Sequence, residues 1–270
     1  MITALFSIEP WEWLVLPLYL IIIFIFASRI QAVNLKKGHV YYKYFTLGLV
    51  AKVFGCIVFC IIYTTYYQGG DTTMYFACSK PFANMATTDF GTYLELLFGE
   101  NTYESRSMFT TETGVPFGYM YYDDKTCMVL RLTSIFILLG GKSYLCSSVL
   151  LGSVSYMGLW KIYKLLNAYY PELYKLMAWA VLFVPSITFW GSGILKDTYT
   201  MAATGLFIYS FHEIIIKKRY RSSMNWLLVL IGASLLVAIK PYILMTILPS
   251  ACLWLLWDRM AQTRNILVYG

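Results

Sequence analysis

Charged residues are scarce in this chain of 270 residues. Only 13% of its residues are Asp, Glu, Lys or Arg, whereas 59% are hydrophobic. Soluble domains carry about 25% charged residues, so this composition excludes an ordinary soluble globular protein. Apolar runs of about 18 residues or more recur along the chain, and a run of that length spans the hydrocarbon of a bilayer. The sequence predicts an all-α, polytopic helical membrane protein with one integral membrane domain over residues 1–270.

Histidines and metal-binding cysteine patterns are also few. The chain has 2 His and 6 Cys, and it contains neither C-x-x-C nor H-E-x-x-H. We therefore predict no metal site, although a divalent metal beside an acidic residue stays open. Cys78 and Cys127 fall in or at the edge of one acidic loop. In an oxidising compartment they could form a disulfide, and otherwise they are two free thiols.

The N-terminal segment lacks the marks of a cleavable signal peptide. Its apolar stretch WEWLVLPLYLIIIFIFA is too long, follows acidic rather than basic residues, and has no A-x-A exit. We expect it to be retained as the first span. The net charge of +7 does not indicate nucleic-acid binding, because the basic residues lie in short loops between spans. The ending TRNILVYG resembles the start of another apolar segment, as expected of a C-terminally truncated chain.

Seven apolar segments are predicted to cross the membrane. They are residues 11–29, 44–67, 143–166, 174–191, 196–216, 223–240 and 243–258. Two spans thus occupy residues 11–67, an extracytoplasmic loop with amphipathic or re-entrant helices occupies 68–142, and five further spans occupy 143–258. The apolar segment 127–140 is too short to cross alone, so we predict that it lies at the interface or re-enters the membrane.

The charges in the connections distinguish the two predicted membrane faces. Basic residues follow the first, third, fifth and seventh spans: Arg29, Lys36, Lys37, Lys43, Lys161, Lys164, Lys175, Lys217, Lys218, Arg219, Arg221, Arg259 and Arg264. The positive-inside rule places them in the cytoplasm, with the N-terminus outside and the C-terminus inside. More than half of the acidic residues lie in the loop at 68–126. We expect a bacterial cytoplasmic (inner) membrane.

A Gly-Gly-Asp sequence stands where the second predicted span leaves the membrane. In YYQGGDTTMYF, Tyr66–Phe76, Gly69 and Gly70 allow a sharp turn and form a candidate loop hinge. Asp71 is then held at head-group height, and Tyr75 follows four residues later. The plain structural interpretation is a glycine helix cap and a polar loop residue within an interfacial tyrosine belt.

A Lys-Asp pair begins the fifth predicted span on the same face. It belongs to PSITFWGSGILKDTY, Pro185–Tyr199, which also contains Trp190. Charges at an apolar boundary are unfavourable unless they are paired or functional. The structural interpretation is that Asp197 charges the first helical turn while Lys196 reaches the interface. The functional interpretation is that both belong to a binding site.

Two further cations are predicted near this face. Lys240 begins the turn Lys240-Pro241-Tyr242 between the last two spans, and Arg131 lies within the short segment 127–140. The structural interpretation is a proline turn with a lysine reaching the interface, and a rim charge on an interfacial helix. The functional interpretation is that these cations face an anionic lipid head group.

Other features are not assigned chemistry. GGKS at Gly140–Ser143 lacks the first glycine of a phosphate-binding loop, because position 136 is Phe136. His39 and His212 lie near the cytoplasmic side and form no cluster. Lys52 lies inside the second span, and we expect its side chain to reach toward the cytoplasmic interface.

The pattern of spans and loops over residues 44–258 resembles the GT-C superfamily of membrane glycosyltransferases. It is similar also to bacterial exopolysaccharide and O-antigen polymerases. The resemblance rests on Asp71 opening the large outer loop, on 89–100 and 127–140 as jaw-like helices, and on the outer turn P-x-x-x-x-W-x-S-G-x-x-K-D. The chain departs from the superfamily pattern in its extra first span and in having no second acid next to Asp71.

The resemblance implies sugar transfer from a polyprenyl-phosphate-linked donor on the extracytoplasmic face. A carboxylate would accept the proton of the acceptor hydroxyl, and fixed cations would stabilise the leaving lipid phosphate. The expected roles are Asp71 as general base, Asp197 orienting Lys196 or contacting the acceptor, Lys196, Lys240 and Arg131 on the phosphate, and Tyr75, Trp190 and Tyr242 on the sugar or acceptor. Membrane lipid is the other expected partner.

Two other classes of function stay open. A transporter or flippase of lipid-linked sugars would need charges deep in several spans and repeat symmetry, whereas only Lys52 is deep and no clear repeat is found. A structural subunit of a membrane complex would show a face of small residues, of which GLVAKVFG at Gly48–Gly55 is a weak example. The sugar, the acceptor and the protein partners are not indicated by the sequence.

Overall fold

The chain is all-helical, as the sequence predicts. The computed structural model describes residues 7–263, with side chains described as far as residue 257, and no strand occurs in that part of the chain. Arg264, and the side chain of Arg259, lie outside the described residues. The helices are α1 (Pro10–Lys36), η1 (Val40–Tyr44), α2 (Phe45–Ile61), η2 (Ile62–Tyr66), α3 (Asp71–Thr88), α4 (Phe90–Phe98), α5 (Tyr103–Ser107), α6 (Gly118–Tyr121), α7 (Asp124–Leu139), α8 (Tyr144–Tyr169), η3 (Pro171–Leu173), α9 (Tyr174–Leu182), α10 (Pro185–Trp190), α11 (Lys196–Phe211), η4 (His212–Ile216), α12 (Ser223–Ile239) and α13 (Pro241–Thr263).

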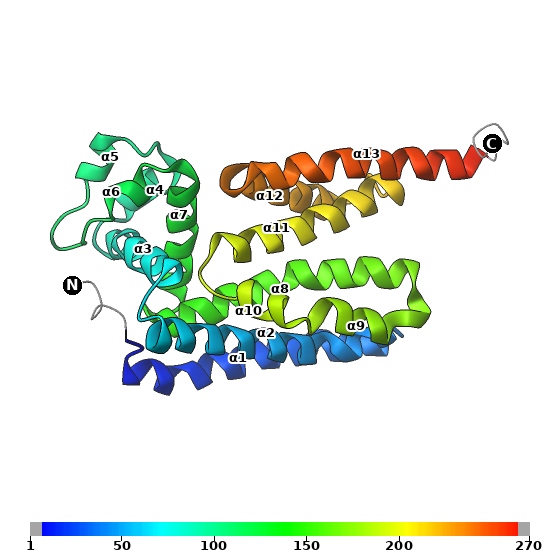
Figure 1. The fold of residues 1–270 in the computed structure, drawn as a ribbon, viewed down its shortest axis with the longest axis horizontal. Helices are drawn as coiled ribbons and strands as arrows, with labels where there is room; N and C mark the ends of the chain where they lie inside the picture. Colours follow the sequence, from blue (N-terminus) through cyan, green and yellow to red (C-terminus); the bar gives the residue numbers. More distant parts are fainter. Residues whose placement is uncertain (1–6, 264–270) are drawn as a thin grey trace.

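The helices form a long bundle with a smaller group of helices at one end. In Figure 1, α1, α2, α8, α9, α11, α12 and α13 run along the long axis, while α3 to α7 gather at the left. The turns at Lys36–Lys43 and Lys217–Arg221 lie at the opposite end of the bundle from α3 to α7. The two kinds of connection that differ in charge in the sequence therefore lie at opposite ends of the molecule.

In the part of the chain that the structure describes, three helices are long and apolar enough to cross a membrane. They are Pro10–Lys36, the continuous segment Val40–Tyr66, and Tyr144–Tyr169, while Ser223–Ile239 and Pro241–Trp257 are apolar but shorter. Length and composition therefore support membrane association for the described residues.

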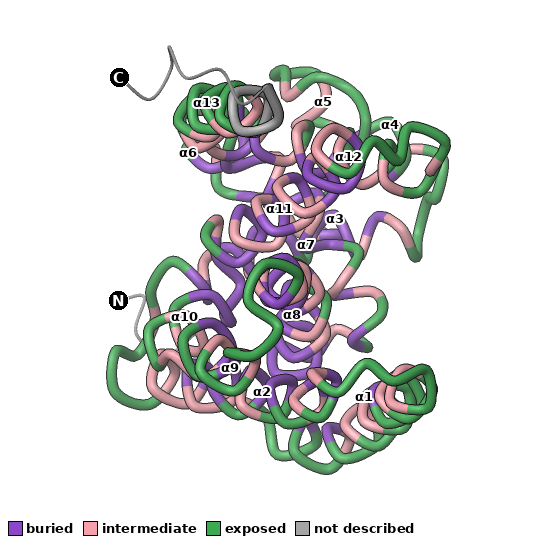
Figure 2. The backbone as a smooth tube through the Cα atoms, turned by 90° about the vertical axis from the view of Figure 1, so that its right-hand side faces the viewer, coloured by how far each residue is buried: buried purple, intermediate pink, exposed green. Residues whose placement is uncertain are grey.

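Burial differs strongly between these helices. Looking along the bundle, Figure 2 shows α8 near the centre with mostly buried positions, and α1 and α13 at the periphery with mostly exposed ones. The exposed residues of α1 include large apolar side chains such as Leu14 and Phe26. An outer helix with an apolar exposed surface is suited to lipid rather than to water.

The helices at the centre approach each other closely at glycines. A Cβ atom on Gly205 of α11 would lie 2.1 Å from the backbone oxygen of Gly158 of α8, so only glycine fits at this crossing. Gly48 and Gly55 of α2 likewise face Tyr156 and the backbone of Thr188. The small residues of GLVAKVFG therefore pack within the chain and do not form an outer face.

The span predicted at 174–191 is wrong as a continuous helix. α9 ends at Leu182, and α10 begins at Pro185 after an extended residue, Val184. Proline supplies no N–H to the preceding turn and disfavours helical angles in the residue before it, so the helix stops there. The predicted span is two short helices, of 9 and 6 residues.

The loop predicted at 68–142 is more helical than expected. α4 and α7 correspond to the predicted helices at 89–100 and 127–140, but α3 begins directly at Asp71 and has 18 residues. Thr73 fixes this start, because its hydroxyl accepts from the N–H of Gly70 and donates to its carbonyl. α7 packs on α3 and lies across the long helices, consistent with a segment that does not cross (Figure 1).

Candidate functional site

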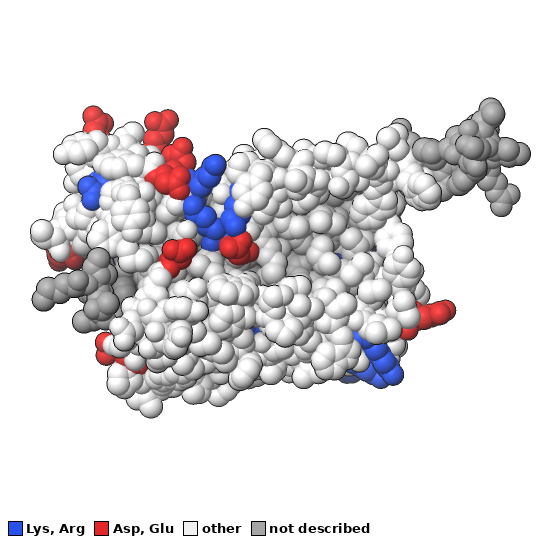
Figure 3. Space-filling view, in the orientation of Figure 1, with Lys and Arg blue, Asp and Glu red and all other residues white. Residues whose placement is uncertain are grey.

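A cluster of charged side chains lies where the α3–α7 group meets α11 and the start of α13. Figure 3 shows acidic and basic side chains gathered on this junction, beside a hollow in an otherwise weakly charged surface. At this junction, ion pairs join Lys196 with Asp123 and Lys240 with Asp197. We call these four residues the charged junction.

Lys196 belongs to the first turn of α11 and reaches across to the start of α7. Its ammonium lies 3.3 Å from the Asp123 carboxylate and donates to the Thr126 hydroxyl at 2.8 Å. Asp123 is the N-cap of α7, accepting from the N–H and the hydroxyl of Thr126. The Thr126 hydroxyl and then Lys196 outweigh partial burial and hold the pKa of Asp123 below its usual value. Asp123 is therefore a carboxylate at neutral pH.

Lys240 pairs with Asp197, the residue that follows Lys196. The Lys240 ammonium donates to the Asp197 carboxylate at 2.5 Å, and Tyr242 lies beside it. We expected Asp197 to orient Lys196 or to contact the acceptor. The ion pairs do not support the first role, because Asp197 pairs with Lys240 and Asp123 pairs with Lys196. The N-terminus of α11 thus carries one ion pair toward α7 and one toward α13.

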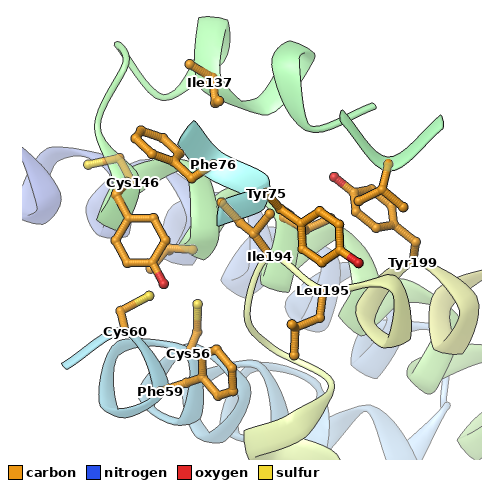
Figure 4. Close-up of a cluster of buried hydrophobic side chains, with 14 of the residues drawn as sticks. Cys56, Phe59, Cys60, Tyr75, Phe76, Ile137, Cys146, Ile194, Leu195 and Tyr199 are labelled. Atoms are coloured by element: carbon orange, nitrogen blue, oxygen red, sulfur yellow. The ribbon is translucent and has the colours of Figure 1, made fainter. Parts of the chain in front are cut away.

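Asp71 and Tyr75 lie on α3 at the edge of the charged junction. Asp71 is exposed in the first turn, where the helix dipole favours a negative charge, and its carboxylate forms no ion pair or hydrogen bond with the described side chains. Tyr75 is buried beside Ile194 and Leu195, which lead into Lys196 (Figure 4). Burial and then the charges of Asp71 and Asp123 raise the pKa of Tyr75 to about 12, so its hydroxyl stays protonated at neutral pH.

The turn before α3 has the backbone that the Gly-Gly sequence predicts. Gly69 and Gly70 have φ angles of 137° and 143°, a region that other residues rarely adopt. A Cβ atom on Gly70 would also lie 2.8 Å from the Tyr63 ring. These two glycines therefore bring Asp71 close to the end of the second helix, as predicted.

A mostly apolar groove begins at the charged junction. It has a volume of about 430 Å³ and runs along α11 from Asp197 to Gly205, between α8, α10 and the start of α13. Its lining includes Trp190, Ile187 and Ile243. Over these residues the groove follows about 12 Å of helix, at 1.5 Å per residue. The end of the groove at Asp197 is therefore charged, and the rest of its lining is mostly apolar.

Lys52 contacts two residues that line this groove. This differs from the expectation that its side chain reaches toward the cytoplasmic interface. Its side chain is fully buried in α2, and its ammonium donates to the carbonyls of Gly191 at 2.5 Å and Ile187 at 3.1 Å. These carbonyls lie at the C-terminal end of α10, which attracts a cation. Ile187 and Gly191 both line the groove. Lys52 therefore fixes the turn that leads to Lys196.

Other predicted site residues lie away from the charged junction. Arg131 is buried and donates to the carbonyl of Gly99 at 2.6 Å, so it ties α7 to the end of α4 and does not join Lys196 and Lys240. Cys78 and Cys127 are free and buried, not joined in a disulfide. Burial raises the pKa of both thiols, that of Cys127 to about 11.

No role for Asp123 or Thr126 was predicted from the sequence. The available signal was Asp-Asp-Lys-Thr at Asp123–Thr126, an N-cap residue followed three positions later by a hydroxyl. Among the described side chains, no group of three or more His, Cys, Asp or Glu residues is placed to hold a metal ion.

Comparison with protein families, with curated proteins and with solved structures gives no match for this chain. Its function is therefore inferred from the chemistry of the charged junction and the groove.

Proposed function

We propose that this chain is a membrane-embedded glycosyltransferase that takes its sugar from a polyprenyl-phosphate-type donor. The observation that carries the proposal is a mostly apolar groove whose charged end is Asp197, the residue that follows Lys196 in the chain and pairs with Lys240. A lipid phosphate has the same division into an apolar tail and an anionic head. Lys196 and Lys240 lie next to Asp197, just outside the lining of the groove, and the groove offers about 430 Å³ for the first part of the tail.

The side chains at this end suit the transfer of a sugar. Asp71 accepts the proton of the acceptor hydroxyl as the oxygen attacks the anomeric carbon. The bond between that carbon and the phosphate oxygen breaks, and the lipid phosphate leaves with the electron pair. Lys196 and Lys240 stabilise the negative charge of the leaving group. Trp190 and Tyr242, exposed beside the groove and beside Lys240, are placed to contact the sugar or acceptor.

The proposal includes a membrane topology. The charged junction and the α3–α7 group face the extracytoplasmic side, and the basic turns at the other end of the bundle face the cytoplasm. The chain then crosses seven times, with α9 and α10 together forming one interrupted crossing and α7 at the interface. The N-terminus is outside, the C-terminus is inside, and the expected location is a bacterial inner membrane.

The first test is native mass spectrometry of the detergent-purified protein. We expect a co-purified polyprenyl phosphate or its sugar conjugate, and its loss from Lys196→Ala. Lys80→Ala is the matched control, because Lys80 is an exposed lysine of α3 outside the charged junction. Only ordinary phospholipid, equal in all three proteins, would contradict the donor site and favour a structural subunit.

A transfer assay with the identified lipid then tests the base. Asp71→Asn should retain the bound lipid and lose at least about 100-fold in transfer rate, the lower range for general base catalysis. Glu104→Gln removes an exposed acid of the same outer group and should transfer normally. Normal transfer by Asp71→Asn would show that another group is the base.

A second candidate function is a flippase or transporter of lipid-linked sugars. It is favoured by the interrupted helix α9–α10 and by Lys52, a buried cation at the interruption. Interrupted helices of this kind form substrate sites in secondary transporters. Movement of a labelled lipid across reconstituted vesicles, without any new glycosidic bond, would support transport in place of transfer.

A further inference from the structure

Each of the two lysines in the charged junction forms an ion pair with an aspartate whose side chain is more exposed. The side chains of Lys196 and Lys240 are 23% and 20% exposed, whereas those of Asp123 and Asp197 are 48% and 62% exposed. The carboxylate is therefore the more accessible partner in each pair. An anion that binds either ammonium group competes with this carboxylate.

Lys196 has a second polar contact besides the one to Asp123. The Thr126 hydroxyl accepts from its ammonium at 2.8 Å, closer than the 3.3 Å to the Asp123 carboxylate. Thr126 lies on α7 and is 7% exposed, so it is a fixed partner. Lys196 can therefore lose Asp123 and stay where it is.

We infer that Asp123 masks Lys196 in the free protein and that the phosphate of the incoming lipid displaces it. This inference rests on the proposed donor site and adds a residue that sets its selectivity. A partly exposed ion pair contributes only about 0.2–1 kcal/mol, so a better anion can replace the carboxylate. A head group without negative charge has nothing to offer Lys196, and the pair stays closed against it.

Asp197 covers Lys240 in the same way, and the two pairs share the start of α11. A phosphate that contacts both lysines meets two cations, whereas each carboxylate holds one. The masks therefore lower the affinity of any anionic ligand that must displace them, and they do so more for an anion that contacts only one of the two lysines. Replacing Asp123 gives the clearer test of the two, because Asp197 was also expected to contact the acceptor.

The test compares neighbouring aspartates. Asp123→Asn removes the mask, and Asp124→Asn removes the same charge from a residue that contacts Asn101 and no lysine. Asparagine is as good an N-cap as aspartate, so α7 should still begin at the same place. Binding of a polyprenyl monophosphate, an uncharged polyprenol and inorganic phosphate is titrated against the detergent-purified proteins. Lys196→Ala is included as the variant that loses the cation.

We expect Asp123→Asn to bind the polyprenyl monophosphate about threefold more tightly than the unmodified protein. Asp124→Asn should bind it unchanged, Lys196→Ala more weakly, and polyprenol should respond to none of the three. A residue that merely supported the fold would show the opposite sign, because its loss would weaken binding.

The outcomes separate this inference from the proposed function. Weaker or unchanged binding by Asp123→Asn, together with weaker binding by Lys196→Ala, would overturn the mask and leave the donor site standing. Equal binding by all variants would overturn both. Tighter binding of inorganic phosphate alone by Asp123→Asn, without any lipid binding, would overturn a lipid as the ligand that displaces Asp123.

Discussion

Lys52 shows how one buried side chain can determine the form of a turn far from it in the sequence. It is fully buried, and its ammonium caps the C-terminal carbonyls of α10 across about 140 residues of chain separation. We predict that Lys52→Met, which keeps the apolar stem, lowers stability by about 1–3 kcal/mol, because buried carbonyls lose their partner. Thermal unfolding in detergent measures this as a fall in Tm on the order of 5 °C.

The control for Lys52→Met is a lysine that makes no such contact. Lys43, exposed at the other end of the bundle, should tolerate the same replacement within about 0.5 kcal/mol. An equal Tm for Lys52→Met and the unmodified protein would contradict the role of Lys52. It would mean that Ser155, which also donates to the carbonyl of Gly191, suffices for the turn.

Among the helices, the peripheral α1 is joined to the central α8 by a buried carboxylate. Glu12 in the first turn of α1 accepts from the Ser143 hydroxyl at 2.5 Å and from the N–H of Leu145 at 2.9 Å. It therefore helps to cap the start of α8, a helix that is more than 100 residues away in the sequence. The extra first helix is thus part of the bundle, although most of its surface is exposed.

We predict that Glu12→Ala lowers stability by about 1–3 kcal/mol, since the cap of α8 loses its acceptor. Unfolding of the purified protein by heat in detergent checks this value. Glu172→Ala is the matched variant, because Glu172 is an exposed acid in η3 and should change stability little. If both replacements had the same small effect, α1 would be held by its apolar contacts alone.

The bundle as a whole has an acidic end and a basic end. The acidic α3–α7 group and the charged junction occupy one end, and the basic turns occupy the other. This separation predicts which side of a membrane each end faces, because basic loops remain in the cytoplasm.

Thiol labelling tests that orientation. Among the six cysteines only Cys252 is exposed, so Cys252→Ser gives a suitable background. In right-side-out vesicles an impermeant maleimide should label Glu104→Cys in the α3–α7 group. It should label Lys218→Cys, in an exposed basic turn, only after the vesicles are opened. The reverse pattern would invert the topology and place the charged junction in the cytoplasm.

The class of fold and most of its helices follow from the sequence alone. Its apolar runs predicted an all-helical chain, and the long segments at 11–29, 44–67 and 143–166 are confirmed as helices of membrane-crossing length. The Gly-Gly-Asp turn and the short helix near 127–140 were also predicted, because positive φ angles and apolar length are local properties. Asp71, Lys196 and Lys240 were chosen from local patterns as well.

Which charged side chains form ion pairs depends on the tertiary structure. Asp123 pairs with Lys196 and Asp197 with Lys240 because α7, α11 and α13 converge, and no local pattern specifies that convergence. The same reason separates Arg131 from the lysines and buries Lys52 against α10. Hydropathy reports how apolar a segment is, whereas the partner of a charged side chain depends on packing between segments that are distant along the chain.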